Sequence, residues 1–299
     1  MLINPLPSFP LVYIHISKAA GNTLASIVLR QYRHVRIVHF SGYNYRSYYE
    51  FCQSFCGTFR HNKEHIRVLT GYIPFGSLDA YLPCKAKYFT FVRDPVKRII
   101  SLYYHILGHP KDELHNYVTK KSMTLDEFVG SDISDELDNY QTRYISGLTD
   151  TPIVKCSSEM LDQAKRNLEN EFVFPGTVEK FDESLILLKR CLHWSMPLYT
   201  KLNVANNRPI RSEIGVKTLS EILKRNSLDV ALYDFVNKRL QKAITNQDTS
   251  FRREVALFRY LNYLYNRSSV VKKVYGKIVA AKGWVEKNAE EQYLVSYEW

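Results

Sequence analysis

The sequence predicts an α/β fold in which a parallel sheet is flanked by helices, with further helices at the C-terminal end. Two observations lead to this fold class. Short apolar, β-branched runs alternate with longer segments of helical periodicity, and strands that alternate with helices form parallel sheets through crossover connections. Hydrophobic residues make up 45% and charged residues 24% of the 299 residues, a balance typical of a globular protein that buries a large core.

The expected elements follow in order from these patterns. The apolar run at 11–17 is predicted to be a strand buried on both faces, and the helical spacing of Leu24, Ile27 and Val28 places a helix at 24–35. Further strands are expected at 35–40, 66–71, 86–92 and 171–176, and further helices at 96–107, 183–194 and 227–244. Residues 111–170 are predicted to be helical and polar with loops at Gly130 and Gly147, and residues 199–213 to be a loop.

The C-terminal part of the chain is basic. We expect residues 1–250 to form one domain and residues 251–299 to form a helical extension, in which nine Lys and Arg side chains lie between Arg252 and Lys287. A solvated helix face is the ordinary explanation of such a run, and a peripheral contact with an anionic membrane is the alternative. A buried apolar stripe is predicted at helical spacing by Val270, Val271, Val274, Ile278 and Ala281.

The net charge of +11 indicates an anionic ligand or partner without identifying it. No zinc-finger spacing and no aromatic RNA-binding box occurs, so no nucleic-acid partner is expected. No apolar run is long enough to span a bilayer and no signal-peptide pattern begins the chain, which predicts a cytoplasmic protein. The five cysteines are sparse and odd in number, and no metal-ligand spacing accompanies Cys52 and Cys56, so we expect reduced thiols and no metal site.

The turn after the first strand has the residues of an anion site. Ala19, Ala20 and Gly21 are small enough for a phosphate to approach the backbone at a helix N-terminus. Asn22 and Thr23 add side-chain donors, and Lys18, just before the turn, adds a positive charge. The pattern is not a Walker A loop, because its lysine comes before the turn. A plain strand-to-helix turn with an exposed lysine is the alternative.

A second candidate phosphate site lies in the segment FVRDPVKRIISLYYH at 91–105. Arg93 follows a buried strand, and Ser101 lies eight residues later, inside the next helix. An arginine and a hydroxyl that converge at the carboxyl end of a parallel sheet suit a phosphate. A local ion pair between Arg93 and Asp94 with helix capping is the alternative.

Together the two motifs, K-x-x-G-x-T and R-D-P-x-x-R-x-x-S, resemble those of PAPS-dependent sulfotransferases, where PAPS is 3′-phosphoadenosine-5′-phosphosulfate. The resemblance is to the type represented by heparan sulfate 2-O-sulfotransferase and bacterial carbohydrate sulfotransferases, and it continues through the segments at 138–147, 174–188 and 228–236. It implies a P-loop-like parallel sheet, PAPS as sulfuryl donor without an obligatory metal, and a carbohydrate or glycoconjugate hydroxyl as acceptor.

The resemblance also implies roles for individual residues. Lys18 matches the lysine beside the phosphosulfate bridge, and residues 19–23 match the loop around the 5′-phosphosulfate. Arg93 and Ser101 match the pair that holds the 3′-phosphate, and Asn207 and Arg208 match more loosely a basic loop over the cofactor. The chain departs from the family pattern at Ser17, where proline is usual, and at Asn22, where threonine or serine is usual.

A further departure concerns the base that deprotonates the acceptor. Tyr72 stands where the family commonly has a histidine, and an unperturbed tyrosine, with a pKa near ~10, is a poor base at neutral pH. Nearby positive charge would have to lower that pKa, or His105, one turn beyond Ser101, would have to take the proton. The segment that contains His61, Glu64 and His65 offers further candidates.

Two other functions stay open on the sequence. A P-loop nucleotide kinase is disfavoured because no lysine follows the glycine turn and no acidic Walker B-like strand end occurs. A non-catalytic nucleotide-binding or membrane-associated relative remains an alternative because of Tyr72. The oligomeric state is left undetermined.

Overall fold

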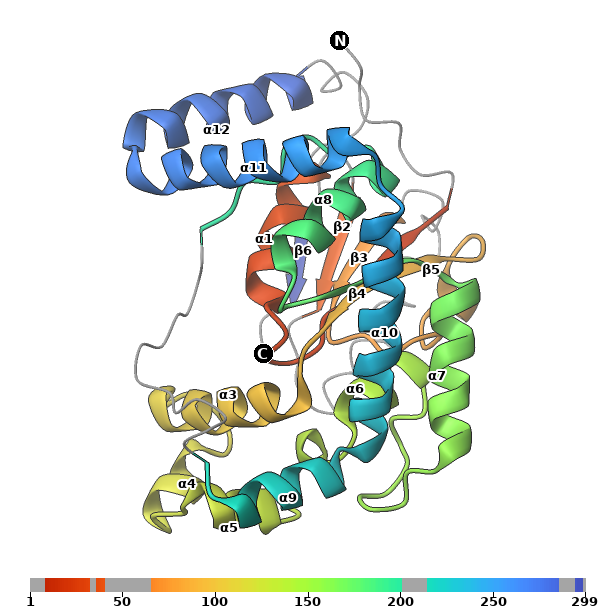
Figure 1. Ribbon diagram of the computed structural model, residues 1–299, viewed down its shortest axis with the longest axis vertical. Helices are drawn as coiled ribbons and strands as arrows, with labels where there is room; N and C mark the ends of the chain where they lie inside the picture. The colour runs from red at the N-terminus through yellow and green to blue at the C-terminus, as the bar shows by residue number, and fades with distance from the viewer. Residues whose placement is uncertain (1–8, 33–35, 41–65, 201–213, 285–293, 298–299) are drawn as a thin grey trace.

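A parallel sheet forms the centre of the protein. The computed structural model describes residues 9–32, 36–40, 66–200, 214–284 and 294–297 (Figure 1). Every strand pairing is parallel, and the strand order is β5-β4-β1-β3-β2-β6. The strands are β1 (Leu11–Ile14), β2 (Arg36–Phe40), β3 (Ile66–Gly71), β4 (Lys87–Val92), β5 (Phe172–Thr177) and β6 (Leu294–Tyr297). The predicted α/β fold class and its first five strands are confirmed.

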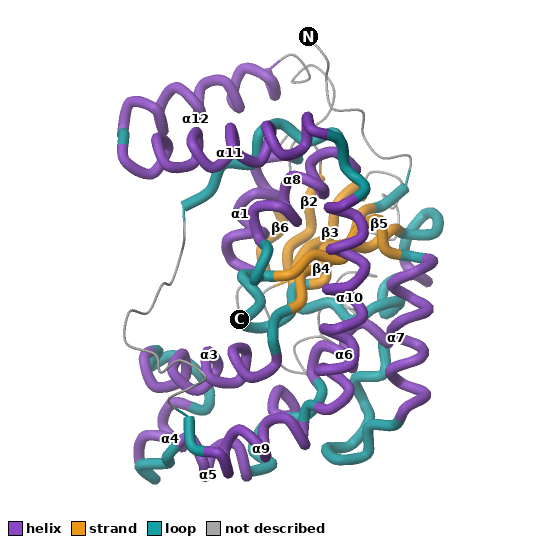
Figure 2. The backbone as a smooth tube through the Cα atoms, viewed as in Figure 1, coloured by secondary structure: helices purple, strands orange, loops and turns teal. Residues whose placement is uncertain are grey.

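The central strand β1 explains how the sheet is covered. Its side chains alternate between two cores, because successive residues of a strand point to opposite faces. Leu11 and Tyr13 pack with α1 (Gly21–Gln31), α8 (Phe181–Leu192) and α11 (Thr249–Arg267). Val12 and Ile14 pack with α6 (Tyr140–Ser146), α7 (Ser158–Asn170) and α10 (Ser227–Thr245). The sheet is therefore buried between two helical layers (Figure 2).

A third apolar cluster lies beyond the carboxyl ends of the strands. It joins α3 (Pro95–Gly108), α4 (His115–Lys120), α5 (Leu125–Gly130) and α9 (Val216–Arg225), which form the lower part of Figure 1. Helix α3 begins where β4 ends, with Asp94 accepting a hydrogen bond from the Lys97 N–H as its N-cap and Pro95 in its first turn. The expected helices between 111 and 170 and the loop at Gly147 are confirmed, whereas Gly130 ends α5 and the loop begins after it; α9 was not predicted.

The C-terminal part of the chain contains two helices, as predicted, and it also supplies β6, which pairs with β2 at the edge of the sheet and was not predicted. Helix α11 buries Phe251, Val255 and Phe258 in the core beside α1 and α8, and α12 (Ser269–Trp284) follows it after one residue. The prediction of a buried stripe on α12 is wrong at two of its positions, since Val270 is 66% exposed and Val274 is 51% exposed. Within the part of the chain described, no helix combines the length and the apolar character needed to cross a bilayer.

Candidate functional site

The candidate site lies at the carboxyl ends of β1, β3 and β4. After β1, the chain turns through Lys18 (φ 61°) and Ala20 (φ 63°), both left-handed, and enters α1 at Gly21. Ala20 is the N-cap residue, no described side chain caps α1, and no acidic residue lies in its first turn. The N-terminal amides of α1 are thus free of an internal side-chain acceptor, which suits an anion.

An imidazole lies against this turn. A Cβ atom on Gly21 would stand 1.5 Å from Nε2 of His15, so only glycine leaves room for the ring. His15 is 5% exposed, and burial, with smaller contributions from His39 and Lys18, lowers the pKa of its imidazole to about 3. The ring is therefore neutral at physiological pH, and it packs directly against Gly21.

The two phosphate motifs meet in the structure. The Arg93 guanidinium donates from Nη1 to the backbone carbonyl of Lys18 at 2.8 Å, across 75 positions of the sequence. The adjacent pairing of β1 with β4, in which Ile14 lies opposite Thr90, brings the two strand ends together. Asp94 caps α3, as the alternative for this segment expected, and Arg93 in addition reaches the turn of the other motif.

Tyr72 reaches the same edge from β3. It follows Gly71, whose carbonyl accepts a hydrogen bond from the His15 N–H at 2.8 Å, and it is 7% exposed. Its ring stacks on that of His15, with 4.3 Å between the centroids. His39, on β2 opposite Thr70, adds a second imidazole near His15, and burial lowers its pKa.

A buried ion pair lies beside the turn and contacts it through Ser17. Arg98 is 0% exposed, and its Nη1 lies 3.7 Å from Oε2 of Glu136. Burial raises the pKa of the Glu136 carboxyl, while the charge of Arg98 and a hydrogen bond from Ser17 oppose this rise. Ser17, which stands where the resemblance leads one to expect proline, thus bonds through its hydroxyl to the carboxyl of the buried ion pair, one residue before Lys18.

The remaining predicted site residues are placed as follows. Ala19 is buried, Thr23 is 7% exposed on α1, and Asn22 is exposed to solvent at the start of that helix. Ser101 is 3% exposed in α3, and its role with Arg93 stays a prediction. His105 lies further along α3, with its ring 3.8 Å from that of His109 and Nε2 3.9 Å from Oδ2 of Asp112. Asn207, Arg208, Cys52, Cys56, His61, Glu64 and His65 lie outside the described residues.

Several residues at the site were missed in the sequence analysis. The sequence contains a sign of His15, which is a histidine inside an otherwise apolar strand. It also contains a sign of Arg98, which is the second arginine of the motif that contains Arg93. The others have no local signal, because long-range packing brings them to the site; they are His39, Glu136, Gln141 and Asp229. Among the described residues, no group of three or more His, Cys, Asp and Glu could hold a metal ion, and Cys84, Cys156 and Cys191 form no disulfide.

Comparison with known proteins finds similarity to carbohydrate sulfotransferases. The sequence model of the galactose-3-O-sulfotransferase family matches residues 2–270. The chain is 31% identical over 166 residues to the heparin sulfate O-sulfotransferase of Drosophila melanogaster, which covers 50% of this chain and 47% of that protein. It is 32% identical over 114 residues to heparan sulfate 2-O-sulfotransferase 1 of Xenopus laevis and of Mus musculus, which covers 36% of this chain and 32% of theirs. The chain therefore matches less than half the length of these curated relatives.

Proposed function

The chain belongs to the galactose-3-O-sulfotransferase family, and from this premise we propose that it transfers the sulfuryl group of PAPS to a hydroxyl of a galactose-containing carbohydrate. The observation that carries the proposal is the hydrogen bond of 2.8 Å from Arg93 Nη1 to the Lys18 carbonyl. It joins the proposed site of the 5′-phosphosulfate to the proposed site of the 3′-phosphate. A donor with phosphates at both ends of its ribose needs two such sites side by side.

The residues of the turn fit a phosphosulfate group. The first amides of α1 have no side-chain cap among the described residues, no carboxylate lies in the first turn, and Ala19, Ala20 and Gly21 carry no side chain larger than a methyl group. Lys18 and Arg93 add two positive charges, and the Arg93 guanidinium donates to the Lys18 carbonyl. This set of donors and cations is chemically complementary to a polyanion.

Sulfuryl transfer requires stabilisation of the departing phosphate oxygen and removal of the acceptor proton. The acceptor hydroxyl attacks sulfur, the bond from sulfur to the bridging phosphate oxygen breaks, and adenosine 3′,5′-bisphosphate leaves. Lys18 neutralises the charge that grows on the departing oxygen, and the α1 amides stabilise the same charge. A base at the acceptor side removes the hydroxyl proton, and Tyr72, stacked on His15, is the proposed group on that side.

Nucleotide binding separates this proposal from its alternatives. We expect adenosine 3′,5′-bisphosphate, without metal, to raise the melting temperature more than AMP or Mg-ATP, because ligands stabilise the state that binds them. A kinase would respond most to Mg-ATP. Equal shifts with all three nucleotides would disprove the 3′-phosphate site.

Activity is then measured with radiolabelled PAPS on acceptors that end in galactose and on heparan sulfate. Transfer to the galactose-containing acceptors supports the proposal. Transfer to heparan sulfate alone would show that the acceptor is heparan sulfate and not a galactose-containing carbohydrate. Selective nucleotide binding with no transfer to any glycan would favour the non-catalytic alternative.

A further inference from the structure

The backbone of Arg93 is held by a buried amide side chain. The Arg93 N–H donates to Oε1 of Gln141 at 2.8 Å, and Nε2 of Gln141 donates to the Arg93 carbonyl at 2.9 Å. Gln141 is 0% exposed, so its amide group has no water as an alternative partner. The β4–β5 pairing ends at Val92 opposite Thr177, which makes Arg93 the first residue beyond the ladder. Gln141 therefore supplies the two hydrogen bonds that a neighbouring strand would otherwise make.

Gln141 is held in turn by a carboxylate from a distant part of the chain. Oδ2 of Asp229 accepts from the Gln141 N–H at 3.1 Å, and Oδ1 accepts from the Thr142 N–H at 2.8 Å and from the Thr142 hydroxyl at 2.7 Å. Asp229 is 0% exposed. These bonds satisfy amides in the first turn of α6 that have no partner within the helix. Asp229 thus fixes the start of α6 and, with it, the backbone from which Gln141 extends.

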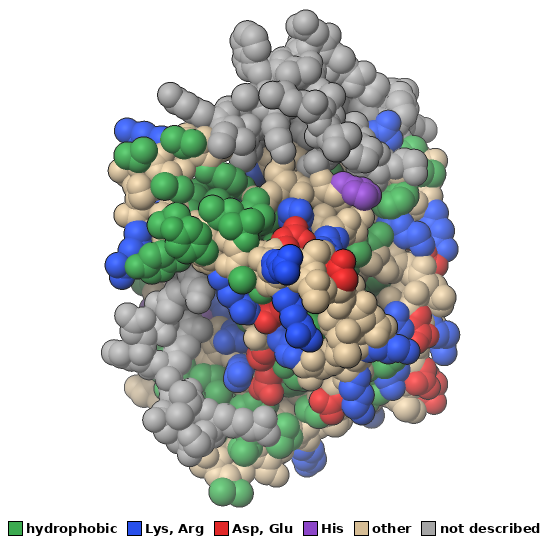
Figure 3. Space-filling model, turned by 45° about the horizontal axis from the view of Figure 1, so that its top comes forward, with side chains coloured by type: hydrophobic (Ala, Val, Ile, Leu, Met, Phe, Trp, Pro, Cys, Tyr) green, Lys and Arg blue, Asp and Glu red, His purple; other side chains and the backbone are tan. Residues whose placement is uncertain are grey.

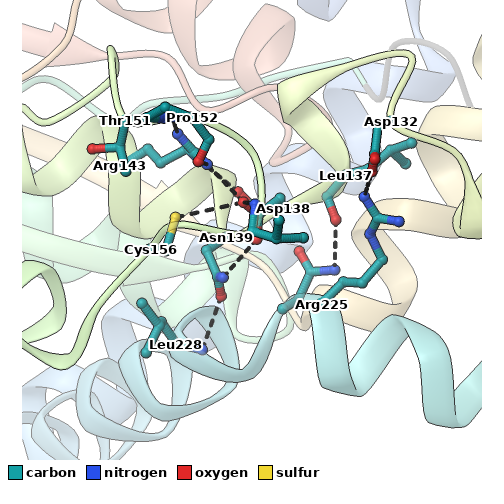
Figure 4. A network of polar contacts seen from close by, with 12 residues as sticks. Asp132, Leu137, Asp138, Asn139, Arg143, Thr151, Pro152, Cys156, Arg225 and Leu228 are labelled. Carbon is teal, nitrogen blue, oxygen red and sulfur yellow. Dashed lines mark hydrogen bonds and ion pairs between the residues drawn. The ribbon is translucent and has the colours of Figure 1, made fainter.

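The start of α10 is fixed reciprocally. Oδ1 of Asn139 accepts from the Leu228 N–H at 2.9 Å and from the Asp229 N–H at 3.2 Å. Figure 4 shows Asn139 reaching toward Leu228 from the segment before α6. Each helix start therefore caps the other, which produces a rigid joint between α6 and α10 at the carboxyl end of β4.

We infer that Gln141 and Asp229 are positioning residues for the proposed nucleotide site, and that they set its preference for a nucleotide with a 3′-phosphate. The inference rests on the proposed function. Arg93 must leave β4 in a defined direction for its guanidinium to reach the Lys18 carbonyl, and the Gln141 amide fixes both backbone groups at that point. Without the amide, two part-buried backbone groups lose these partners and the direction of Arg93 is no longer fixed by them.

The test compares Gln141→Leu with Asn167→Leu, a control in α7 whose side chain contacts the other end of α6. Asn167 is 5% exposed and donates from Nδ2 to the carbonyls of Ile145 and Ser146 at 2.9 and 3.3 Å, far along α6 from Arg93. Asn167→Leu thus also removes buried hydrogen bonds from α6 without touching the Arg93 backbone. Calorimetry measures the dissociation constants of adenosine 3′,5′-bisphosphate and AMP for each variant, and kinetics measures KM for PAPS and kcat.

We expect Gln141→Leu to lower the preference for adenosine 3′,5′-bisphosphate over AMP, measured as the ratio of their affinities, by about tenfold or more. It should also raise KM for PAPS by a larger factor than it lowers kcat. Asn167→Leu should lose thermal stability and keep the wild-type ratio. If Gln141→Leu does not fold, Gln141→Met keeps the length of the side chain and removes both hydrogen bonds, and the same loss of nucleotide preference is expected. A wild-type ratio in the folded Gln141 variant would overturn the inference, whereas a wild-type protein that does not distinguish the nucleotides would overturn the proposed donor itself.

Discussion

His15 and Tyr72 stack ring against ring at the carboxyl end of the sheet, with 4.3 Å between their centroids and 21° between their planes. The contact depends on the pairing of β1 with β3, in which Ile14 lies opposite Gly71. An imidazole that is neutral and buried thus lies beside the phenol that occupies the family's histidine position. The contact therefore joins the ends of two strands that are about 57 residues apart in sequence, and we propose that it lies on the acceptor side of the site.

The first prediction concerns the base. Tyr72→Phe should lose about a hundredfold or more in transfer rate, because it removes the phenol oxygen and leaves the stacked ring in place. Tyr72→His should retain activity with an optimum nearer neutral pH. The measurement is the rate of sulfuryl transfer as a function of pH, with His105→Ala as the comparison. A fully active Tyr72→Phe together with an inactive His105→Ala would place the base on α3.

The second prediction concerns acid stability. The pKa of His15 is lowered from 6.5 to about 3 in the folded state, so the unfolded chain binds more protons between these values. The stability that follows from the neutral ring is fully present above pH 6.5 and is lost as pH falls toward about 3, at up to about 1.4 kcal/mol per pH unit. His15→Asn should flatten the fall of the unfolding free energy in urea over this range. The exposed His193, changed to Asn, is the control, and an equal flattening there would contradict the assignment.

The third prediction concerns the glycine of the turn. Gly21→Ala places a Cβ 1.5 Å from His15 Nε2, so the ring or the turn must move. We expect a loss of about 1–3 kcal/mol in unfolding free energy and a larger loss of nucleotide binding, because the turn itself is displaced. Gly108→Ala, where no heavy atom lies within 4 Å of the new Cβ, should leave both unchanged or raise stability slightly. Normal nucleotide binding by Gly21→Ala would show that the turn tolerates the clash.

The fourth prediction concerns Lys18. Lys18→Ala should lower turnover by about a hundredfold or more, because the lysine charge is needed most when the bridging oxygen becomes negative. Binding of adenosine 3′,5′-bisphosphate should weaken much less. Lys97→Ala, on the solvent-exposed side of α3, is the matched control for loss of one positive charge. Turnover near the wild-type value would remove Lys18 from the chemistry.

The fifth prediction concerns the outer surface of α11 and α12. Apolar side chains that are half exposed or more gather there, and Figure 3 shows hydrophobic side chains on that part of the face with Lys and Arg at their margin. The apolar residues are Leu257, Tyr260, Tyr263, Val270 and Val274, and the exposed basic residues beside them are Arg252, Arg253, Arg267, Lys272 and Lys273. Aromatic and apolar side chains with flanking cations suit the surface of an anionic membrane.

We expect the full chain to sediment with anionic liposomes, and the double variant Leu257→Ser, Tyr260→Ser to bind more weakly. High salt should also release the protein, because part of the attraction is electrostatic. Val216→Ser changes an 86% exposed side chain on α9 and is the control. Equal sedimentation of all variants with anionic and neutral lipid would refute a specific surface.

Much of the fold follows from local pattern. The apolar run at 66–71 became β3 with the predicted bounds, and Pro95 and Asp94 marked the start of α3, since strand burial and helix capping are decided by adjacent residues. The resemblance to heparan sulfate 2-O-sulfotransferases, carried by the residues around Lys18 and Arg93, is confirmed by the comparisons. The roles of the site residues remain predictions.

The sequence by itself determined five of the six described strands, the turn after β1 and the choice of Lys18 and Arg93 as candidate cations, because these depend on short-range spacing. Only the tertiary structure decided what those residues contact. The bond from Arg93 to Lys18, the stacking of His15 on Tyr72 and the amide of Gln141 on Arg93 each require two segments that the sheet order and the α6–α10 joint bring together. Such contacts depend on which strands pair and which helix starts cap each other, and no periodicity within a single segment encodes that choice.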